Sequence, residues 1–257
     1  MTNIALITGA SSGLGMEFAR QLDSAPDVDE IWLVARNEEK LQEVASSLKT
    51  PAVPVPADLT SDADIATIAS ALQDGNINVR FLVNSAGFGK IGPWDAISTE
   101  AEETMIDLNC KAVVTLTRMC LPYMQRGSHI IQIASAAAFA PLPDMNVYAA
   151  TKAFVLRYTR ALRWEIRSKG IVATALCPTW VKTGFEKTAR DTKDGGKAVN
   201  SFLFAQTPQT VVSRAIAASR RGSAVCCASI PSMCLRVIGK VVPDSITMAG
   251  WEVIRKL

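Results

Sequence analysis

Short apolar runs alternate with helix-like segments along most of this chain, and this alternation restricts its fold more than any other feature. The apolar runs suit buried strands and cover 4–8, 31–35, 53–57, 81–84, 130–135, 172–177 and 224–230. Helical patterns lie between them, at 16–22, 37–49, 62–72, 100–124, 148–169 and 208–221. Strands joined through helices pair in parallel, because each crossover returns the chain to the same edge of the sheet. We therefore expect an α/β fold, with one doubly wound parallel sheet of about seven strands and helices on both faces.

Length and composition fit one globular domain over residues 1–257, with 49% hydrophobic and 20% charged residues. The net charge is +3 and no run interleaves basic with aromatic residues, so no nucleic-acid partner is expected. No apolar run reaches the roughly 18 residues that a transmembrane helix needs. The N-terminus enters a strand without a presequence, so we expect a cytoplasmic protein.

Cysteine and histidine are placed in ways that argue against a metal site. The six cysteines include no CxxC pair, and the chain's one histidine, His129, lies near none of them. Most of the cysteines are expected to be small buried apolar residues. His129 starts the fifth predicted strand, at the end away from a ligand, and is predicted to be structural. With no other imidazole in the chain, Ser-His-Asp and Cys-His schemes are excluded.

A glycine-rich turn follows the first apolar run. Residues 8–15 read Thr-Gly-Ala-Ser-Ser-Gly-Leu-Gly, and a helical pattern starts directly after them. Glycines let an anion approach the backbone, and a helix N-terminus offers free N–H groups with partial positive charge. The spacing Gly-x3-Gly-x-Gly differs from the dinucleotide-binding G-x-G-x-x-G, and a plain tight turn is the alternative. The strand-to-helix junction favours a phosphate site.

The end of the second predicted strand bears on the choice of coenzyme. In a nucleotide-binding β-α-β unit this point lies near the adenosine ribose, where an acidic residue selects NAD and an arginine selects NADP. Here Ala35 is followed by Arg36, which favours NADP(H), with NAD(H) as the alternative. A solvated Arg36 at the start of a charged helix would carry no such meaning. After the third strand, Asp58 is placed either to hydrogen-bond adenine or to cap the next helix.

Small and polar residues end the fourth predicted strand and interrupt the helix that follows. Asn84-Ser85-Ala86-Gly87 either lets the backbone lie against a flat cofactor or only forms a turn. Asn109 stands in an otherwise apolar helical pattern, where it is a poor helix former and needs partners if buried. Asn109 is either a satisfied buried side chain or a polar relay behind an active site.

Ser135, Tyr148 and Lys152 form the predicted reactive set. On a helix, Tyr148 and Lys152 stand at i and i+4 and share one face, which is also what an ordinary exposed helix shows. A nearby ammonium favours the phenolate, so we expect the pKa of Tyr148 to fall below its usual value of about 10. A phenol tuned in this way donates or accepts a proton. Ser135 ends the fifth strand, at the edge where ligands bind, and is placed to hold a carbonyl oxygen.

Two segments near the C-terminus are predicted to surround a substrate. Residues 180–206 are polar, contain glycine and end in aromatics, which favours a mobile lid over a plain surface insertion. Residues 231–257 are apolar with interspersed basic residues, and breaks are expected at Gly239 and Pro243. This tail is predicted to cover the pocket or contact a partner subunit, rather than to lie on a membrane surface.

In these motifs and their order, the chain resembles the short-chain dehydrogenases/reductases of the compact single-domain type, a family with a Rossmann-like fold. The matching residues span 3 to about 185 and are Thr8-Gly9-Ala10-Ser11-Ser12-Gly13-Leu14-Gly15, Asp58, Asn84-Ser85-Ala86-Gly87, Asn109, Ser135, Tyr148, Lys152, Pro178 and Thr183. Two positions depart from the family pattern. Ser85 stands where a second asparagine is common, and Thr179 where glycine is common.

The resemblance implies hydride transfer between a nicotinamide and a carbonyl carbon, with four catalytic residues. Tyr148 would give or take the proton, and Lys152 would lower the pKa of Tyr148 and hold the nicotinamide ribose. Ser135 would bind the substrate oxygen, and Asn109 would position a water that links Lys152 to solvent. The implied cofactor contacts are Gly9, Ser11, Ser12, Gly13, Leu14, Gly15, Arg36, Asp58, Leu59, Asn84, Ala86, Gly87, Tyr148, Lys152, Pro178, Val181 and Thr183.

The predicted pocket residues are mainly apolar. They are Phe88, Ile91, Trp94, the stretch from Ala137 through Leu142 to Met145, Trp180, Phe185, Phe202 and Phe204, beside Ser135 and Tyr148. A bulky apolar ketone or secondary alcohol is therefore favoured as the substrate, such as a steroid, a bile acid or a fatty-chain carbonyl.

Two alternatives to this function stay open. A 3-oxoacyl thioester on an acyl carrier protein would need a basic patch beside the pocket mouth. A non-catalytic nucleotide-binding scaffold or sensor would need none of the four reactive residues. Members of the family usually form homodimers or homotetramers, which the resemblance places on the helices at about 100–124 and 148–169.

Overall fold

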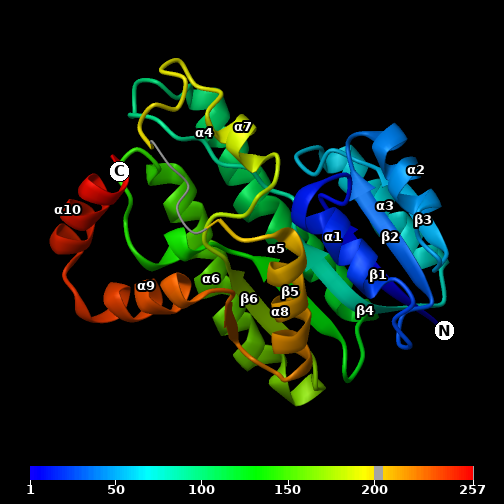
Figure 1. The fold of residues 1–257 in the computed structure, drawn as a ribbon. Coiled ribbons are helices and arrows are strands. Elements are labelled where there is room, and N and C mark those ends of the chain that lie inside the picture. The colour runs from blue at the N-terminus through cyan, green and yellow to red at the C-terminus, as the bar shows by residue number, and fades with distance from the viewer. Residues whose placement is uncertain (200–204, 257) are drawn as a thin grey trace.

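The computed structural model describes residues 1–199 and 205–256, and a parallel sheet runs through its centre (Figure 1). Within these residues, seven strands form one sheet in the order β3-β2-β1-β4-β5-β6-β7, and every neighbouring pair is parallel. The strands are β1 (Thr2–Thr8), β2 (Glu30–Ala35), β3 (Ala52–Pro56), β4 (Ile77–Asn84), β5 (His129–Ile133), β6 (Val172–Cys177) and β7 (Val225–Cys227). From β1 the chain adds β2 and β3 on one side, and from β4 it adds β5, β6 and β7 on the other side. This order confirms the predicted doubly wound α/β class.

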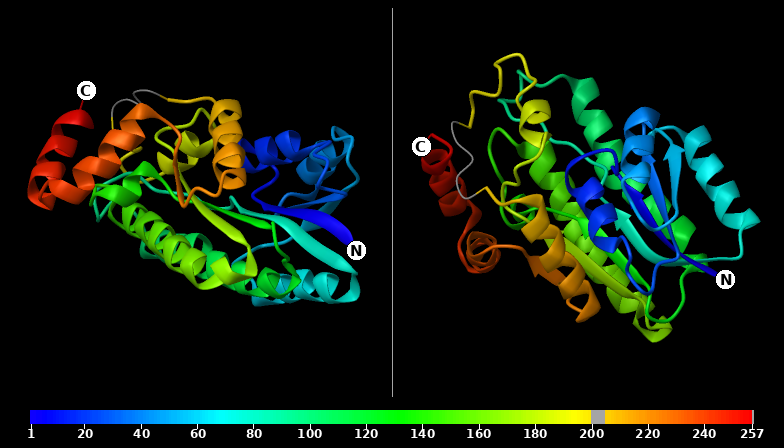
Figure 2. Two further views of the ribbon diagram at one scale, coloured as in Figure 1. Left: turned by 90° about the horizontal axis from the view of Figure 1, so that it is seen from below. Right: turned by 45° about the vertical axis from the view of Figure 1, so that its right-hand side comes forward.

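Helices cover both faces of the sheet, as the two views of Figure 2 show. One face packs against α1 (Gly13–Leu22), α2 (Glu38–Ser46) and α8 (Pro208–Arg220). The other face packs against α3 (Asp62–Asp74), α5 (Ala112–Cys120) and α6 (Asn146–Ile166). Neighbouring residues of β4 belong to different sides, Phe81 to the first core and Leu82 to the second. Apolar strands buried on both faces are what a parallel sheet with two helical layers requires.

The single helix expected over 100–124 is divided in the structure. It consists of α4 (Thr99–Ile106), a π-helical turn η1 (Asp107–Lys111), α5 and a short 3-10 turn η2 (Leu121–Tyr123). Asn109 lies in the π-helical turn, with its amide bonded to the backbone of Phe88 instead of to its own helix. Such turns occur mostly at functional sites, and here the turn points one side chain at the loop after β4.

The C-terminal region also differs from the expected boundaries. The last strand was expected over 224–230, but β7 ends at Cys227 and α9 (Ile230–Val241) begins three residues later. Ser229 caps α9, accepting a hydrogen bond from the backbone N–H of Ser232 at 3.3 Å, and this cap stops the strand early. Gly239 does not break α9, whereas Pro243 separates it from α10 (Asp244–Ile254). None of the described helices is long and apolar enough to cross a membrane.

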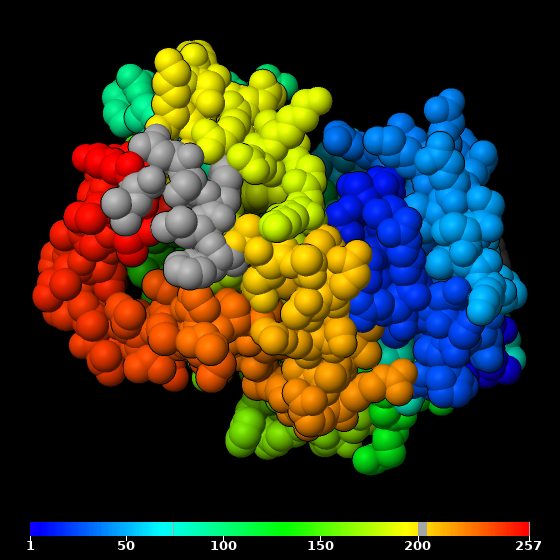
Figure 3. Space-filling model, in the orientation of Figure 1, coloured from blue at the N-terminus to red at the C-terminus, as the bar shows by residue number. Residues whose placement is uncertain are grey.

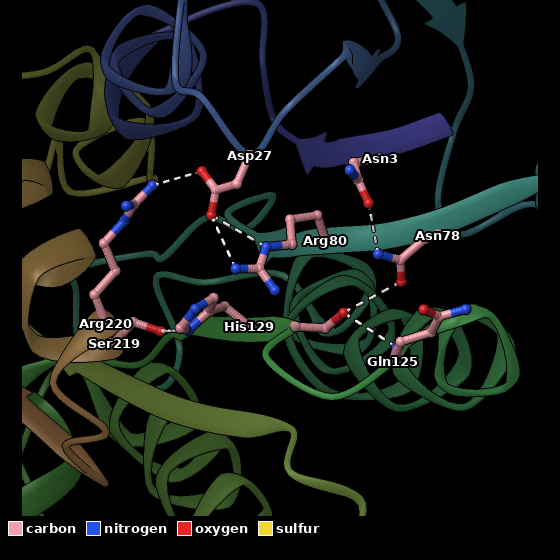
Figure 4. A network of polar contacts seen from close by, with 9 residues as sticks. Asn3, Asp27, Asn78, Arg80, Gln125, His129, Ser219 and Arg220 are labelled. Atoms are coloured by element: carbon pink, nitrogen blue, oxygen red, sulfur yellow. Dashed lines mark hydrogen bonds and ion pairs between the residues drawn. The ribbon is translucent and has the colours of Figure 1, made fainter. Parts of the chain in front are cut away.

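A polar network occupies the edge of the sheet where the strands begin (Figure 4). Asp27 accepts ion pairs from Arg80 at 3.1 Å and from Arg220 at 2.8 Å. His129 lies buried beside them, stacked on Phe81, with its Nδ1 3.0 Å from the Ser219 hydroxyl. The prediction that His129 is structural agrees with this position, at the end of β5 opposite Ser135.

The burial of His129 makes the stability of the fold depend on pH. Burial first, and then the nearby Arg80 and Arg220, lower the pKa of His129 to about 4. The unfolded chain keeps a value near about 6.5, so between these two values it binds more protons than the native state. The free energy of unfolding should therefore fall as the pH drops from about 6.5 toward about 4, by at most about 3 kcal/mol.

We expect His129→Gln to lose this part of the pH dependence, because the chain has one histidine. Urea unfolding of the variant and the wild type at about pH 7 and about pH 5 measures the difference. Equal losses of stability in the two proteins would show that another group is responsible.

Candidate active site

The glycine turn over residues 8–15 packs closely against two neighbouring segments. Gly9 and Gly13 have φ angles of +66° and +55°, a conformation that side chains disfavour. A Cβ on Gly9 would lie 3.0 Å from the backbone of Ala86, and a Cβ on Gly15 would collide with the carbonyl oxygen of Gly9. The turn therefore needs glycine at these positions to bring β1, the loop after β4 and α1 together. Gly9, Ser11, Ser12, Gly13 and Leu14 line the cavity described below, whereas Gly15 supports the turn from behind.

Arg36 and Asp58 mark one end of that cavity. Arg36 lies just beyond β2, its side chain is 81% exposed, and its Nη1 lies 4.0 Å from Asp58 Oδ2. Asp58 Oδ1 accepts hydrogen bonds from the hydroxyl of Thr60 at 2.7 Å and its backbone N–H at 2.9 Å. These bonds, with a smaller contribution from Arg36, hold the pKa of Asp58 below its usual value. Asp58 thus orders the turn after β3 and does not cap α3, whose N-cap is Ser61.

Asn84 is the predicted cofactor contact that the structure moves away from the cavity. Its side chain is buried behind the wall and donates to Gln132 Oε1 at 2.9 Å and to Thr117 Oγ1 at 3.1 Å. The backbone after it takes the expected place, since Ser85, Ala86 and Gly87 line the cavity. The Asn84 side chain therefore points between β4, β5 and α5, and the expected cofactor contact at this position, which involves the backbone around Asn84 to Gly87, stays a prediction. Sequence alone cannot tell the two directions apart at the last residue of a strand.

Ser135, Tyr148 and Lys152 come together at the carboxyl ends of β5 and β6. Tyr148 and Lys152 share one face of α6, and Ser135 follows β5 by two residues. The Tyr148 hydroxyl and Ser135 are hydrogen-bonded. Lys152 Nζ donates to the carbonyl oxygen of Ile133 at 2.9 Å and lies 5.7 Å from the centre of the Tyr148 ring. All three residues line the cavity, and both residues of the helical pair are buried, so the pair is not an exposed helix face.

The pKa of Tyr148 differs from the expected one. Burial raises it to about 12, and the hydrogen bond with Ser135 opposes this shift. Burial also lowers the pKa of Lys152 to about 8. The Lys152 ammonium is directed at Ile133, so it does not overcome the desolvation of the phenol. The expectation of a lowered pKa was wrong because the sequence reveals the i, i+4 pair but not how deeply it is buried.

Asn109 ties the loop after β4 to α6. Its Nδ2 donates to the carbonyl oxygen of Phe88 at 2.8 Å and to Thr151 Oγ1 at 3.1 Å, and its Oδ1 accepts from the Phe88 N–H at 3.2 Å. Thr151 in turn donates to the carbonyl oxygen of Tyr148 at 2.9 Å. Of the two interpretations of Asn109, the satisfied buried amide fits these contacts, and its role in positioning a water stays a prediction.

A cavity of about 1390 Å³ joins these groups and continues past them between apolar side chains. The predicted pocket residues Phe88, Ala137, Leu142, Met145, Trp180 and Phe185 line it, as do the predicted cofactor contacts Leu59, Pro178, Val181 and Thr183. Trp94 does not, since it is 79% exposed, and Ile91 is buried in the core next to the pocket. Phe202 and Phe204 lie outside the described residues. The far part of the cavity is lined by residues of α9, α10 and the link between them that sequence reasoning did not single out: Leu235, Ile238, Val242, Ile246, Trp251 and Ile254.

Trp251 of α10 and Arg255, the residue directly after it, fasten this helix to the loop before α6. Trp251 Nε1 donates to the carbonyl oxygen of Pro143 at 2.9 Å. Arg255 Nη1 lies 2.8 Å from Asp144 Oδ2 and also donates to the carbonyl oxygen of Ala198 at 2.8 Å. Asp144 has a φ of +60°, so these bonds hold a residue in a backbone conformation that few side chains adopt. We call Trp251 and Arg255 the C-terminal clasp.

Comparisons with known proteins agree with this geometry. The sequence matches the short chain dehydrogenase family over residues 3–194. An uncharacterized oxidoreductase of Staphylococcus epidermidis is 37% identical over 182 residues, which cover 70% of this chain and 78% of that protein. Sulfoacetaldehyde reductase 2 of Chromohalobacter salexigens is 32% identical over 208 residues, covering 74% and 80%.

A solved structure of a short-chain dehydrogenase from Sphingobium yanoikuyae, in complex with NADPH, superposes with a TM-score of 0.79 at 26% identity, covering 99% of this chain and 96% of that one. The chain is a member of the short-chain dehydrogenase/reductase family. It is an oxidoreductase that uses a nicotinamide nucleotide and acts on CH–OH groups.

Proposed function

We propose that this protein is an NADP(H)-dependent oxidoreductase that interconverts a bulky apolar ketone and its secondary alcohol, with hydroxysteroids and bile acids as the favoured substrates. One observation carries the proposal. The cavity runs from Arg36 and Asp58, past the glycine turn, to Ser135 and Tyr148, and ends between the apolar side chains of α9 and α10. A dinucleotide accounts for the first part, and the remaining part is the size and character of a site for an apolar substrate.

The cavity wall fits a nicotinamide nucleotide closely. At Gly87, an added Cβ would lie 2.7 Å from Asn109 Oδ1 and 3.4 Å from Lys152 Nζ, so the missing side chain keeps a flat surface beside the reactive groups. Gly9, Ser12 and Gly13 would hold the pyrophosphate at the start of α1. Val181 and Thr183 would hold the carboxamide. When bound, the coenzyme supplies or accepts the hydride.

Tyr148 would act as the proton donor when a ketone is reduced. A buried phenol with a pKa of about 12 is protonated at neutral pH, so the group is ready to donate a proton to a developing alkoxide. Ser135, bonded to the same hydroxyl, would hold the substrate oxygen in line. Lys152 would add positive charge beside the phenol as the proton leaves, and would hold the ribose hydroxyls. Asn109 would act from behind this set, through Thr151 and α6.

The segment 180–206 is proposed as the lid of the substrate site. Its two ends are joined, because the N–H of Gln206 donates to the Trp180 carbonyl at 2.8 Å and the N–H of Lys182 donates to the Gln206 carbonyl at 2.9 Å. Phe185 of α7 (Phe185–Ala189) lies against Tyr148, with ring centres 5.5 Å apart. A loop with fastened ends that touches the reactive tyrosine is suited to close over a substrate.

Exposed Phe154 and Trp164 on α6 support a homodimer or homotetramer through this helix.

We expect Arg36→Ala to remove a preference for NADPH over NADH. A guanidinium bonded to the 2′-phosphate contributes roughly 1.5–3 kcal/mol, so affinity for NADPH should fall by about 10- to 100-fold while affinity for NADH changes little. Fluorescence titration of both coenzymes with wild type and variant measures this. Lys49→Ala, which removes an exposed cation that lies beyond the C-terminal end of α2 and does not line the cavity, is the matched control. Equal binding of both coenzymes by the wild type would contradict the proposed selectivity.

A panel of ketones tests the substrate class. With the preferred coenzyme, turnover should be highest for steroid and bile-acid ketones, lower for 3-oxoacyl thioesters and lowest for small charged aldehydes. Lys90, the cation nearest the pocket in the loop after β4, is already bonded to the backbone oxygen of Asp191 at 2.6 Å and to its carboxylate at 3.2 Å. It is therefore poorly placed to bind a substrate carboxylate. A clear preference for a small anionic aldehyde would overturn the proposed substrate class.

A further inference from the structure

The helix α9 has an outward apolar face that nothing in the described chain covers. Ile230, Met233, Val237 and Val241 recur at intervals of three and four residues and form one stripe, and each is more than half exposed. Nine of the fifteen large apolar side chains that the described residues expose fall within 230–254. The other six are spread over the rest of the described surface, whereas this concentration marks an interaction surface. In Figure 3, α9 and α10 form a projecting arm at one side of the molecule.

The rest of α9 shows why the stripe is free. Ser232, on the inner side, donates to the carbonyl oxygen of Cys177 at 2.5 Å. Gly239, about two turns further on, packs against the backbone of Phe139, where a Cβ would collide. These two small residues anchor the helix, so the opposite side is left facing outward. The outward stripe is thus fixed in place by the fold.

Basic residues border the stripe on one side. Arg236 and Lys240 flank it on α9, and Lys256 is exposed near the end of the chain. Within 230–256 there are four basic and two acidic residues, and one of the acids, Glu252, is paired with Arg255 and Lys256. An apolar helix face with a basic border is the pattern of a helix that lies in the interface of an anionic bilayer. A second copy of this chain fits less well. In a two-fold contact through this helix face, Arg236 and Lys240 of one copy would lie close to the same two cations of the other copy, and the like charges would repel.

The mouth of the substrate cavity adjoins the same surface. Leu235 and Ile238, on the flank of α9 next to the stripe, line the cavity and are exposed. Ile246 and Ile254 of α10 are likewise both exposed and part of its wall. A surface seated on lipid would therefore bring the cavity next to the acyl region.

We infer that the face made by α9 and α10 docks on the surface of an anionic lipid membrane, through the stripe Ile230, Met233, Val237 and Val241 and the basic border Arg236 and Lys240. The inference concerns binding and does not require the proposed activity. The membrane position is peripheral, with the stripe at the boundary between headgroups and acyl chains and the Rossmann-like body in water. The lining of the cavity by α9 and α10 agrees with the prediction that the tail covers the pocket, and the inference adds a membrane contact on the outer side of the same two helices.

Flotation with vesicles tests the inference directly. The purified full chain should co-float with vesicles of phosphatidylcholine mixed with phosphatidylglycerol, and only weakly with phosphatidylcholine alone. Val241→Asp should reduce the bound fraction by about tenfold or more, because it puts a charge into the stripe that would be buried in the lipid. The matched control is Trp94→Asp, which changes a similarly exposed apolar residue in the loop after β4, outside α9 and α10, at 79% against 73% exposure, and should bind like the wild type.

Two charge-reversal variants give a second, independent measurement. Lys240→Glu should weaken binding to the anionic vesicles by about fivefold or more, while Lys49→Glu should not, and added salt should weaken wild-type binding. Thermal unfolding confirms that each variant is folded. Absence of vesicle binding by the folded wild type would overturn the inference. So would a concentration-dependent dimer in sedimentation that Val241→Asp dissociates without any vesicle binding, since that result assigns the stripe to a second copy.

Discussion

Replacing Tyr148 by phenylalanine should lower kcat by about 10²- to 10⁴-fold while leaving coenzyme affinity nearly unchanged. The substitution removes only the hydroxyl, the group that is hydrogen-bonded to Ser135 and is proposed to donate the proton. The ring keeps its contact with Phe185. Coenzyme oxidation with the best ketone of the panel measures turnover, and fluorescence titration measures coenzyme binding.

Two further variants make this result specific. Ser135→Ala should lower turnover less than Tyr148→Phe, since the phenol remains in place. Tyr158→Phe, on the same helix but outside the cavity, should behave like the wild type. Equal turnover by Tyr148→Phe and the wild type would remove Tyr148 from the proposed mechanism, and would favour a protein that only binds the nucleotide.

Replacing Lys152 by methionine should separate activity from stability. Activity should fall by about 10²-fold or more, because the variant loses the cation beside the phenol and the proposed ribose contact. The free energy of unfolding at about pH 7 should not fall. Burial lowers the pKa of Lys152 to about 8, which means that the folded protein disfavours the charged ammonium form. A methionine of similar length avoids this desolvation cost. A variant that is inactive and at least as stable as the wild type is the signature of a residue kept for chemistry.

The pH dependence of the wild type checks the same group. As the pH rises through about 8, Lys152 loses its proton, so kcat/KM for ketone reduction should decline above this value. The residual activity of Lys152→Met should lack this decline. A decline of the same size in both proteins would place the titration on another group. Urea unfolding of the two proteins at neutral pH completes the comparison.

The sheet and the meeting point of the reactive residues were within reach of the sequence. Buried parallel strands give continuous apolar runs, so all seven strands could be placed before the structure was known. Ligands gather at the carboxyl ends of such strands, and this rule brought Ser135 and the pair Tyr148 and Lys152 to one edge. The boundaries that failed depend on single hydrogen bonds, such as the cap on Ser229 that ends β7 and the Asn109 amide that opens a π-helical turn.

Burial and side-chain direction were out of reach. The pKa of Tyr148 depends on desolvation by segments distant in sequence, which no local pattern records. Asn84 ends a strand, where the side chain can face either the cofactor or the neighbouring strand. In the structure it faces the neighbouring strand and donates a hydrogen bond to Gln132. The tail was ambiguous for a different reason. Apolar residues with interspersed bases suit a pocket cover, a subunit contact and a membrane surface alike, and only the packing of Ser232 and Gly239 shows which side of α9 faces inward.

The C-terminal clasp has a practical consequence for anyone who purifies or engineers this enzyme. Arg255 follows directly after α10 and holds Asp144, four residues before Tyr148. Residues added after position 257 would lie close to this clasp, so we expect a C-terminal affinity tag to disturb the wall of the cavity and lower the measured activity. The chain starts at the other end of the molecule, beside the strand edge that carries the polar network of His129 (Figure 1). A tag at the N-terminus would not disturb the cavity. Mutant libraries that aim at new ketones should include the last two turns of α10.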